Sequence, residues 1–206
     1  MPEDARPVLN AEFWDRRYRE DDWAYGTEPN DFLKAEAGRI PMGEVLCLAE
    51  GQGRNAVHLA GLGYRVEAVD QSEAGLARAG LLAAQRGVPL RTRKADLAEF
   101  DLGRNRWQGI VSIFVHLPMP LRREVHRRAV AALAPGGVLL METYAPEQIA
   151  LGTGGPKEPG RLCSLQDLRE DFQGLEWLIA RELRREVREG RYHDGLAAVI
   201  QLLGRK

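Results

Sequence analysis

Cysteine is scarce in this sequence, and its scarcity excludes two kinds of architecture. The chain has 206 residues but only two cysteines, Cys47 and Cys163, which lie far apart. Two cysteines are too few for a disulfide framework or a cysteine-based metal centre, and Cys47 sits inside an apolar, strand-like run. We therefore expect two reduced thiols and no bound metal.

Long apolar runs and an excess of charge are also missing. No apolar run approaches the roughly 20 residues of a membrane-spanning helix, and the first residues have neither a basic nor an apolar signal region. Lys plus Arg number 29 against 30 Asp plus Glu, so the net charge attracts neither nucleic acid nor an anionic membrane. We expect a cytoplasmic protein whose partner is a small molecule, and we leave its oligomeric state open.

What is present is the composition of an ordinary globular protein. Hydrophobic residues make up 44% of the chain and charged residues 29%, and proline and glycine are scattered rather than clustered. A chain of 206 residues is within the range of one large domain with one core. We predict a single domain over residues 1–206.

From residue 44 onward, apolar runs of strand length alternate with segments of helical periodicity. The pattern predicts strands at 44–49, 65–70, 89–94, 109–115 and 137–144, and helices at 55–62, 73–86 and 120–134. This alternation is typical of an α/β fold, in which helices cover both faces of a mostly parallel sheet.

Both ends of the chain depart from this alternation. Near the N-terminus the pattern predicts helices over 11–20 and from about Pro29. At the other end, residues 175–187 and 196–203 predict an antiparallel hairpin. We interpret the alternating charges from Arg181 to Arg191 as a solvated strand face, and His193 as an exposed turn residue.

One segment carries the chemistry, because residues 45–56 combine an apolar strand, a glycine turn and the start of a helix. Gly51 and Gly53 let a ligand approach the backbone closely, and the first N–H groups of the helix offer hydrogen-bond donors. Asp70 stands 19 residues after Gly51, at the end of the second strand. Its carboxylate is placed to accept hydrogen bonds from the ribose hydroxyls of an adenosine ligand.

This motif by itself leaves two cofactors open. Gly51, Gly53 and Ala56 satisfy the dinucleotide fingerprint, which keeps a nicotinamide-dependent oxidoreductase as an alternative. Glu50 precedes the turn, where a carboxylate would repel a pyrophosphate but tolerate the ammonium and sulfonium of S-adenosylmethionine. Too little chain follows the fifth strand for a separate substrate domain, which also favours the cationic cofactor.

The residues resemble class I S-adenosylmethionine-dependent methyltransferases, and are similar to the small bacterial branch of tellurite-resistance and thiopurine methyltransferases. Residues 46–55 look like the first motif, with Ala49 at the place of its leading glycine, and residues 133–138 look like the turn into strand five. The resemblance implies a Rossmann-like, seven-stranded sheet with an antiparallel last strand. It also implies S-adenosylmethionine as cofactor and a helical cover over its site, formed by residues 1–40.

The resemblance further implies which residues hold the cofactor. Asp70 and Gln71 would meet the ribose, and Asp96 would accept from the adenine amino group. The full set of expected cofactor-binding residues is Tyr25, Ala49, Glu50, Gly51, Gly53, Asn55, Asp70, Gln71, Ala95, Asp96, Leu97 and Ser112.

Catalysis is less clearly marked. His116 follows the fourth strand, where an imidazole could orient or deprotonate an acceptor, or simply form a wall. Tyr144 ends the fifth strand and is interpreted as packing or as an acceptor contact, and the glycine-rich residues 152–156 as a lid or a plain surface loop. We expect methyl transfer to a small molecule, with a thiol or a chalcogen oxyanion as candidates. A non-catalytic S-adenosylmethionine-binding protein remains a further alternative.

Overall fold

Seven strands form one sheet in the computed structural model, which describes residues 10–20 and 23–206. Their order in the sheet is β3-β2-β1-β4-β5-β7-β6. The strands are β1 (Glu44–Leu48), β2 (Arg65–Asp70), β3 (Arg91–Lys94), β4 (Trp107–Ile113), β5 (Leu133–Tyr144), β6 (Glu176–Arg188) and β7 (Asp194–Arg205). The first five run parallel to their neighbours, whereas β7 is antiparallel to both β5 and β6. The predicted Rossmann-like sheet with an antiparallel C-terminal hairpin is confirmed.

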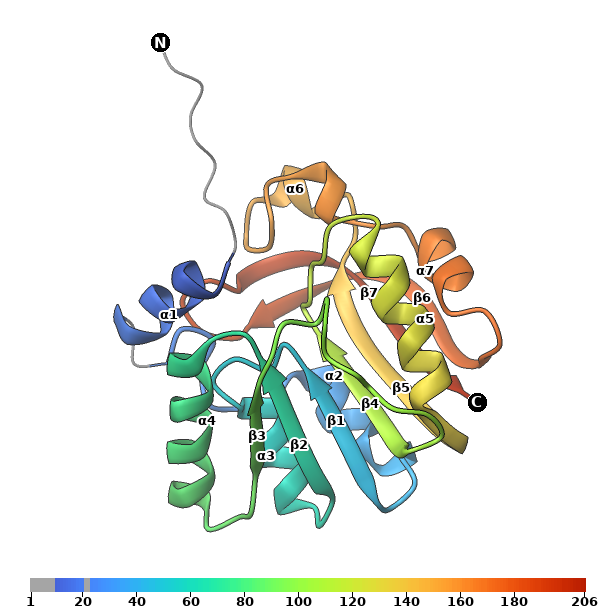
Figure 1. Cartoon of the computed structure of the whole chain (residues 1–206). Coiled ribbons are helices and arrows are strands. Elements are labelled where there is room, and N and C mark those ends of the chain that lie inside the picture. Colours follow the sequence, from blue (N-terminus) through green and yellow to red (C-terminus); the bar gives the residue numbers. More distant parts are fainter. Residues whose placement is uncertain (1–9, 21–22) are drawn as a thin grey trace.

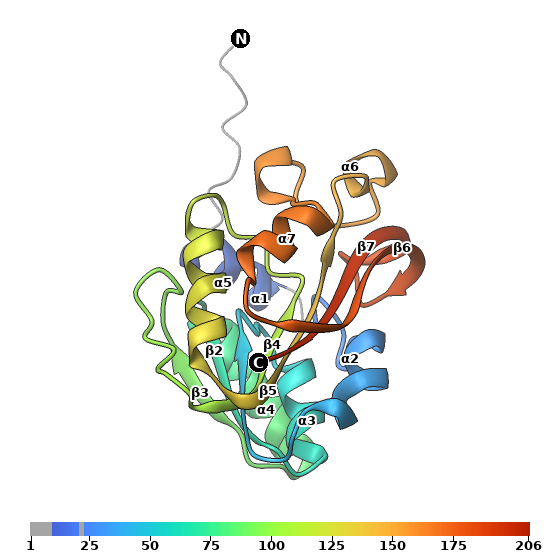
Figure 2. The same cartoon turned by 90° about the vertical axis from the view of Figure 1, so that its right-hand side faces the viewer.

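Helices cover both faces of this sheet, as the alternation predicts. Figures 1 and 2 show α5 and α7 on one face and α2 and α3 on the other. The α-helices are α1 (Ala11–Glu20), α2 (Asp31–Glu36), α3 (Arg54–Gly61), α4 (Glu73–Arg86), α5 (Leu121–Ala132), α6 (Gln148–Leu151) and α7 (Leu165–Asp171), with 3-10 helices η1 (Ala37–Arg39) and η2 (Pro159–Arg161). No helix in the described part of the chain is long and apolar enough to span a membrane.

Local capping explains where several helices begin and end. The Asn30 side chain accepts from the N–H of Leu33 at the start of α2, and Ser72 accepts from the N–H of Gly75 at the start of α4. Gly87 ends α4 in the left-handed conformation. The expected helix at 11–20 is confirmed, but the expected cover over residues 1–40 lies partly outside the described residues.

The sheet separates two apolar cores. Leu46 and Leu48 of β1 pack on the side of α5 and α7, and Val45 and Cys47 pack on the side of α2 and α3. Both sets are fully or almost fully buried because alternate residues of a strand point to opposite faces. Cys47 and Cys163 are both buried, unpaired thiols. With both faces covered, ligands have access at the edge where the parallel strands end.

Candidate active site

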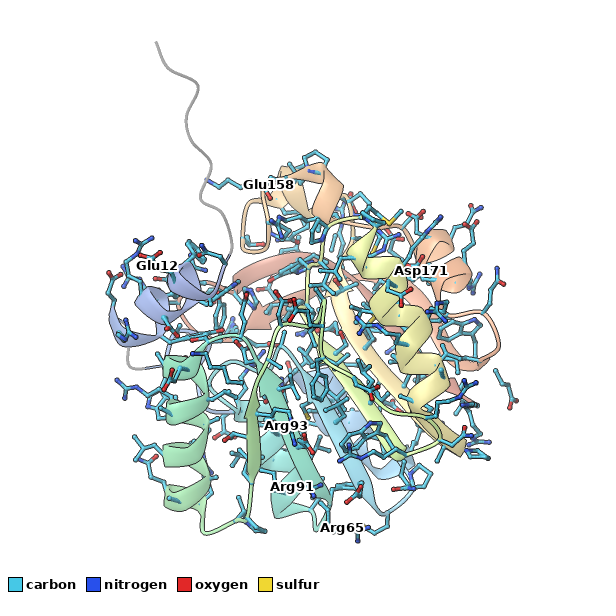
Figure 3. All side chains as sticks on the ribbon, in the orientation of Figure 1. Glu12, Arg65, Arg91, Arg93, Glu158 and Asp171 are labelled. Carbon is cyan, nitrogen blue, oxygen red and sulfur yellow. The ribbon has the colours of Figure 1, made fainter. Side chains whose placement is uncertain are left out.

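A large cavity of about 1260 Å³ lies at the carboxyl edge of the parallel strands. Figure 3 places Glu158 at this edge and Arg65 and Arg91 toward the opposite one. One end of the cavity is lined by residues that follow β1, β2 and β3, and the other by residues that follow β4, by the loop after α6 and by the β6–β7 turn. The helix α1 contributes a further wall, with Phe13, Trp14, Arg17 and Tyr18.

The glycine turn after β1 has left-handed backbone at three positions. The φ angle is +46° at Ala49, +60° at Gly51 and +87° at Gly53. A Cβ atom on Gly51 would lie 2.5 Å from the Tyr18 hydroxyl, and one on Gly53 would lie 2.5 Å from the Cβ of Ala79. These glycines therefore give room to α1 and α4. Neither glycine lines the cavity, and the expected close approach of a ligand to them stays a prediction.

Glu50 accepts hydrogen bonds from two of the helix N–H groups that were expected to meet a ligand. Its Oε1 accepts from the N–H of Asn55 at 3.0 Å and from the N–H of Ala56 at 2.8 Å, in the first turn of α3. The carboxylate thus caps the helix, as negative groups do at helix N-termini. Burial raises the pKa of Glu50 to about 7. A pyrophosphate at this turn would meet occupied donors and an acidic group, which disfavours a dinucleotide.

Asp70 ends β2 on the same wall and is only 6% exposed. Its Oδ2 accepts from the N–H of Gly51 at 2.8 Å, and its Oδ1 accepts from the N–H of Ser72 at 2.8 Å. Burial raises the pKa of this carboxyl above its ordinary value. The backbone N–H of Gln71 also hydrogen-bonds to this carboxyl. A carboxylate offers about four lone-pair sites, so one remains for a ribose hydroxyl.

The structure brings most of the predicted site residues together. Nine of them line the cavity: Tyr25, Ala49, Glu50, Asp70, Gln71, Ala95, Asp96, Leu97 and His116. The other four, Gly51, Gly53, Asn55 and Ser112, do not. The Asn55 side chain instead accepts from the N–H of Asn30, and Ser112 is buried within β4.

Phe114, His116 and His193 line the far end of the cavity, and the fully buried Tyr144 packs against these rings. Phe114, with a φ of +54°, stacks on Tyr144 at a centroid distance of 4.5 Å, and Tyr144 stacks on His116 at 5.5 Å. The centroid of the His193 ring lies 4.7 Å from the ring centroid of Phe114 and 4.7 Å from that of Tyr25. The expectation that His193 is an exposed turn residue is wrong, because the β6–β7 turn folds inward and leaves His193 8% exposed.

The charges of the hairpin are not simply a solvated face either. Glu189 pairs with Arg54, the first residue of α3, and accepts from Arg185 at 2.8 Å. Arg185 also pairs with the buried Glu142 of β5. The side-chain amide of Asn30 donates to Glu142 at 2.7 Å and to Glu189 at 2.9 Å. Because β7 lies between β5 and β6, residues remote in the sequence share one buried network that joins the turn to α3.

Sequence reasoning also missed Arg17. It lines the cavity, donates to the Tyr25 hydroxyl at 2.9 Å, and lies 4.2 Å from the centroid of the Tyr192 ring. Periodicity marks α1 as amphipathic, but it does not show that the helix packs beside α4 (Figure 1) and meets the β6–β7 turn.

Comparison with known proteins agrees with this arrangement. Residues 45–137 match the family model of the methyltransferase domain. Among curated proteins, none matches the chain.

Solved structures resemble the chain over most of its length. One solved structure concerns the conversion of a disulfide bond into a thioacetal group during echinomycin biosynthesis. It is 21% identical to this chain with a TM-score of 0.76, and the alignment covers 95% of this chain and 91% of that chain. TehB from Haemophilus influenzae has 20% identity and a TM-score of 0.72, with coverages of 95% and 66%. The N-methyltransferase NodS from Bradyrhizobium japonicum WM9, in complex with S-adenosyl-L-homocysteine, has 16% identity and a TM-score of 0.69, with coverages of 95% and 97%. Residues 45–137 therefore match a methyltransferase domain, and the chain shares the fold of the N-methyltransferase NodS.

Proposed function

We propose that the protein transfers the methyl group of S-adenosylmethionine to a small molecule held at the aromatic end of the same cavity. The observation that carries this proposal is one continuous cavity with two chemically different ends. Its volume of about 1260 Å³ exceeds the roughly 300–1,000 Å³ of a pocket for one ligand. The room for a second molecule argues against a protein that only binds the cofactor.

The residues at the first end fit the cofactor. Asp70 would hold a ribose hydroxyl, with Gln71 beside it, and Asp96 would accept from the adenine amino group. Glu50 and Tyr25, which both line the cavity, would face the cationic methionine moiety. When bound, S-adenosylmethionine supplies an activated methyl group, and an in-line attack on it needs alignment and exclusion of water.

The titration of His116 supports a mechanism without a strong base. Burial lowers the pKa of His116 to about 3, far from the value near the working pH that a general base needs. Burial also raises the pKa of Tyr144 above its ordinary value, so that its hydroxyl stays protonated. A thiol or a chalcogen oxyanion, which reacts without help from a strong base, is therefore the acceptor we propose.

The methyltransferase branch, the domain organisation, the location and the partners that we propose rest on composition and on similarity to solved structures. The similarity to TehB, at 20% identity, is the ground for proposing the tellurite-resistance and thiopurine branch. We further propose that residues 1–206 act as one cytoplasmic domain, with the N-terminal helices covering the cofactor, and without nucleic acid or membrane as partner.

The experiment that tests the function is calorimetric titration of the purified protein with S-adenosylmethionine, S-adenosylhomocysteine and NADH. We expect micromolar binding of the first two and none of NADH. Turnover is then measured as formation of S-adenosylhomocysteine with thiols, tellurite and selenite as acceptors. Selective binding of NADH would overturn the proposal in favour of an oxidoreductase, and cofactor binding without turnover of any acceptor would contradict the methyl-transfer step.

A further inference from the structure

The last strand of the sheet presents a long edge. In the described part of the chain, β6 stands at the end of the strand order and pairs with β7 alone (Figure 2). The strand runs over 13 residues, from Glu176 to Arg188. Because an edge strand of this length is a template for pairing with another strand, the residues along it decide what the edge can bind.

The hydrogen bonds of the hairpin show which backbone groups of β6 face this edge. The N–H of Glu189 donates to the carbonyl of His193 at 2.8 Å, so these two residues form a hydrogen-bonded pair at the end of the ladder. Such pairs alternate along antiparallel strands, so odd-numbered residues of β6 bond to β7 and even-numbered residues face outward. Ala198, opposite Arg184, agrees with this alternation, because its N–H donates to Oε1 of Gln148, which follows β5 on the other side of β7.

The four even-numbered residues near the end of β6 have exposed side chains of alternating charge. They are Glu182, Arg184, Glu186 and Arg188. In a second copy aligned antiparallel about a two-fold axis at Arg185, residue 184 lies opposite residue 186, and residue 182 lies opposite residue 188. Each glutamate then faces an arginine of the other copy, and such cross-strand pairs stabilise a sheet. The two-fold axis makes every pair occur twice.

Neighbouring alignments do not have this complementarity. A centre at residue 184 would place Glu182 opposite Glu186, and a centre at residue 186 would place Arg184 opposite Arg188. A shift by an odd number of residues would place outward-facing backbone groups opposite inward-facing ones, which cannot form a ladder. Charges on edge strands often oppose pairing. Here they oppose the neighbouring alignments and favour one.

The opposite face of β6 tolerates the same alignment. Arg185 would lie opposite its own copy, but in each chain it is already paired with Glu142 and Glu189, and its side chain is 14% exposed. Its charge is therefore compensated within its own subunit. Leu183 and the buried Val187 would lie opposite each other across the axis and add an apolar pair.

We infer that β6 is a dimer interface whose partner is β6 of a second copy of this chain, aligned antiparallel about Arg185. The ladder joins the two sheets into one, and ion pairs between Glu182 and Arg188 and between Arg184 and Glu186 set its register. This inference does not depend on the cofactor or the acceptor, so it stands or fails separately from the proposed function.

The test is sedimentation velocity of the purified full chain and its charge variants. The wild type should sediment as a dimer, with twice the chain mass of 23.0 kDa. R184E and E186R each place like charges opposite one another on both sides of the axis, and each should weaken dimerisation about 10-fold to 100-fold. The double variant R184E/E186R has the composition of the wild type and opposite charges again, so it should dimerise as the wild type does.

Mixing the two single variants gives the sharpest result. R184E supplies two glutamates at positions 184 and 186 and E186R supplies two arginines, so an equimolar mixture should form a heterodimer although neither variant dimerises well alone. E124R reverses an exposed charge on α5 and is the matched control, which should dimerise as the wild type does. Circular dichroism checks that each variant is folded.

Three results would overturn the inference. One is a wild-type protein that stays monomeric at the highest concentration measured. Another is a dimer that R184E and E186R leave as tight as E124R does, since the interface would then lie elsewhere. The third is a failure of the mixed single variants to associate more tightly than either does alone.

Discussion

Glu50 should make the affinity for S-adenosylmethionine depend on pH. Its carboxyl caps α3, lines the cavity and has a pKa raised by burial to about 7. With that pKa it is about 9% ionised at pH 6 and about 76% ionised at pH 7.5. If the cationic ligand binds only the ionised form, its dissociation constant falls about eightfold over this range, or about 1.2 kcal/mol.

The substitution Glu50→Gln isolates this effect. A Gln side chain has the same shape, and its amide oxygen still accepts from the N–H groups of Asn55 and Ala56, as Oε1 does now. The variant should bind more weakly at pH 7.5 and lack the eightfold change. Titration of Asp70 and of the ligand's own amino group is common to both proteins, so the difference between them reports Glu50 alone.

The measurement is titration calorimetry at pH 6 and 7.5 in two buffers of different ionisation enthalpy. At pH 6 the wild-type protein should release close to one proton for each S-adenosylmethionine bound, and E50Q none from this position. An affinity that changes equally with pH in both proteins would refute the reasoning, since the pH dependence would then belong to another group.

Protein stability offers a second readout with a defined sign. The folded-state pKa of Glu50 lies above the ordinary value of 4.5, so the ligand-free folded protein binds this proton more tightly than the unfolded chain does. The free energy of unfolding should therefore decline, relative to E50Q, as pH rises from about 4.5 to about 7. Urea unfolding of both proteins across this range checks the sign.

Three further predictions concern stability and affinity. Asp70→Ala should raise the dissociation constant of S-adenosylhomocysteine about 10-fold to 100-fold, because the ribose loses its acceptor, and an unchanged value in calorimetry would contradict the assignment. Ala49→Gly should stabilise the protein by about 0.5–1 kcal/mol in urea unfolding, because Ala49 has a φ of +46° that costs a non-glycine residue strain. Glu189→Ala leaves the buried charges of Arg54 and Arg185 short of a partner and should cost about 3–5 kcal/mol. Glu147→Gln, at an exposed ion pair, is its control and should leave the unfolding midpoint unchanged.

Much of the fold could be predicted because it is encoded locally. The strand at 65–70 and the helix at 73–86 coincide with β2 and α4, since apolar periodicity and the Ser72 cap are properties of consecutive residues. The site at the end of β1 and β2 could be predicted for the same reason. Parallel strands end at one edge, so residues that follow two of them meet there.

The roles of Gly51, Gly53 and Glu50 could be predicted only in part. The turn was recognised from its glycines, but their Cβ positions are closed by Tyr18 and Ala79, which come from α1 and α4. Glu50 was expected to face a ligand, and it also caps α3. Which neighbour fills the space beside a backbone depends on helix packing, which local sequence patterns do not encode.

By itself, then, the sequence determined the α/β alternation, the strand–turn–helix motif and the carboxylate of Asp70 at the end of β2, because each depends on residues close together in the chain. The tertiary structure alone decided that β7 inserts between β5 and β6. That insertion buries Glu189 against Arg54 and turns His193 into the cavity beside Phe114. Strand order is set by hydrogen bonds between segments that are distant in the sequence. The sequence pattern of the C-terminal hairpin would be the same whether β6 or β7 paired with β5.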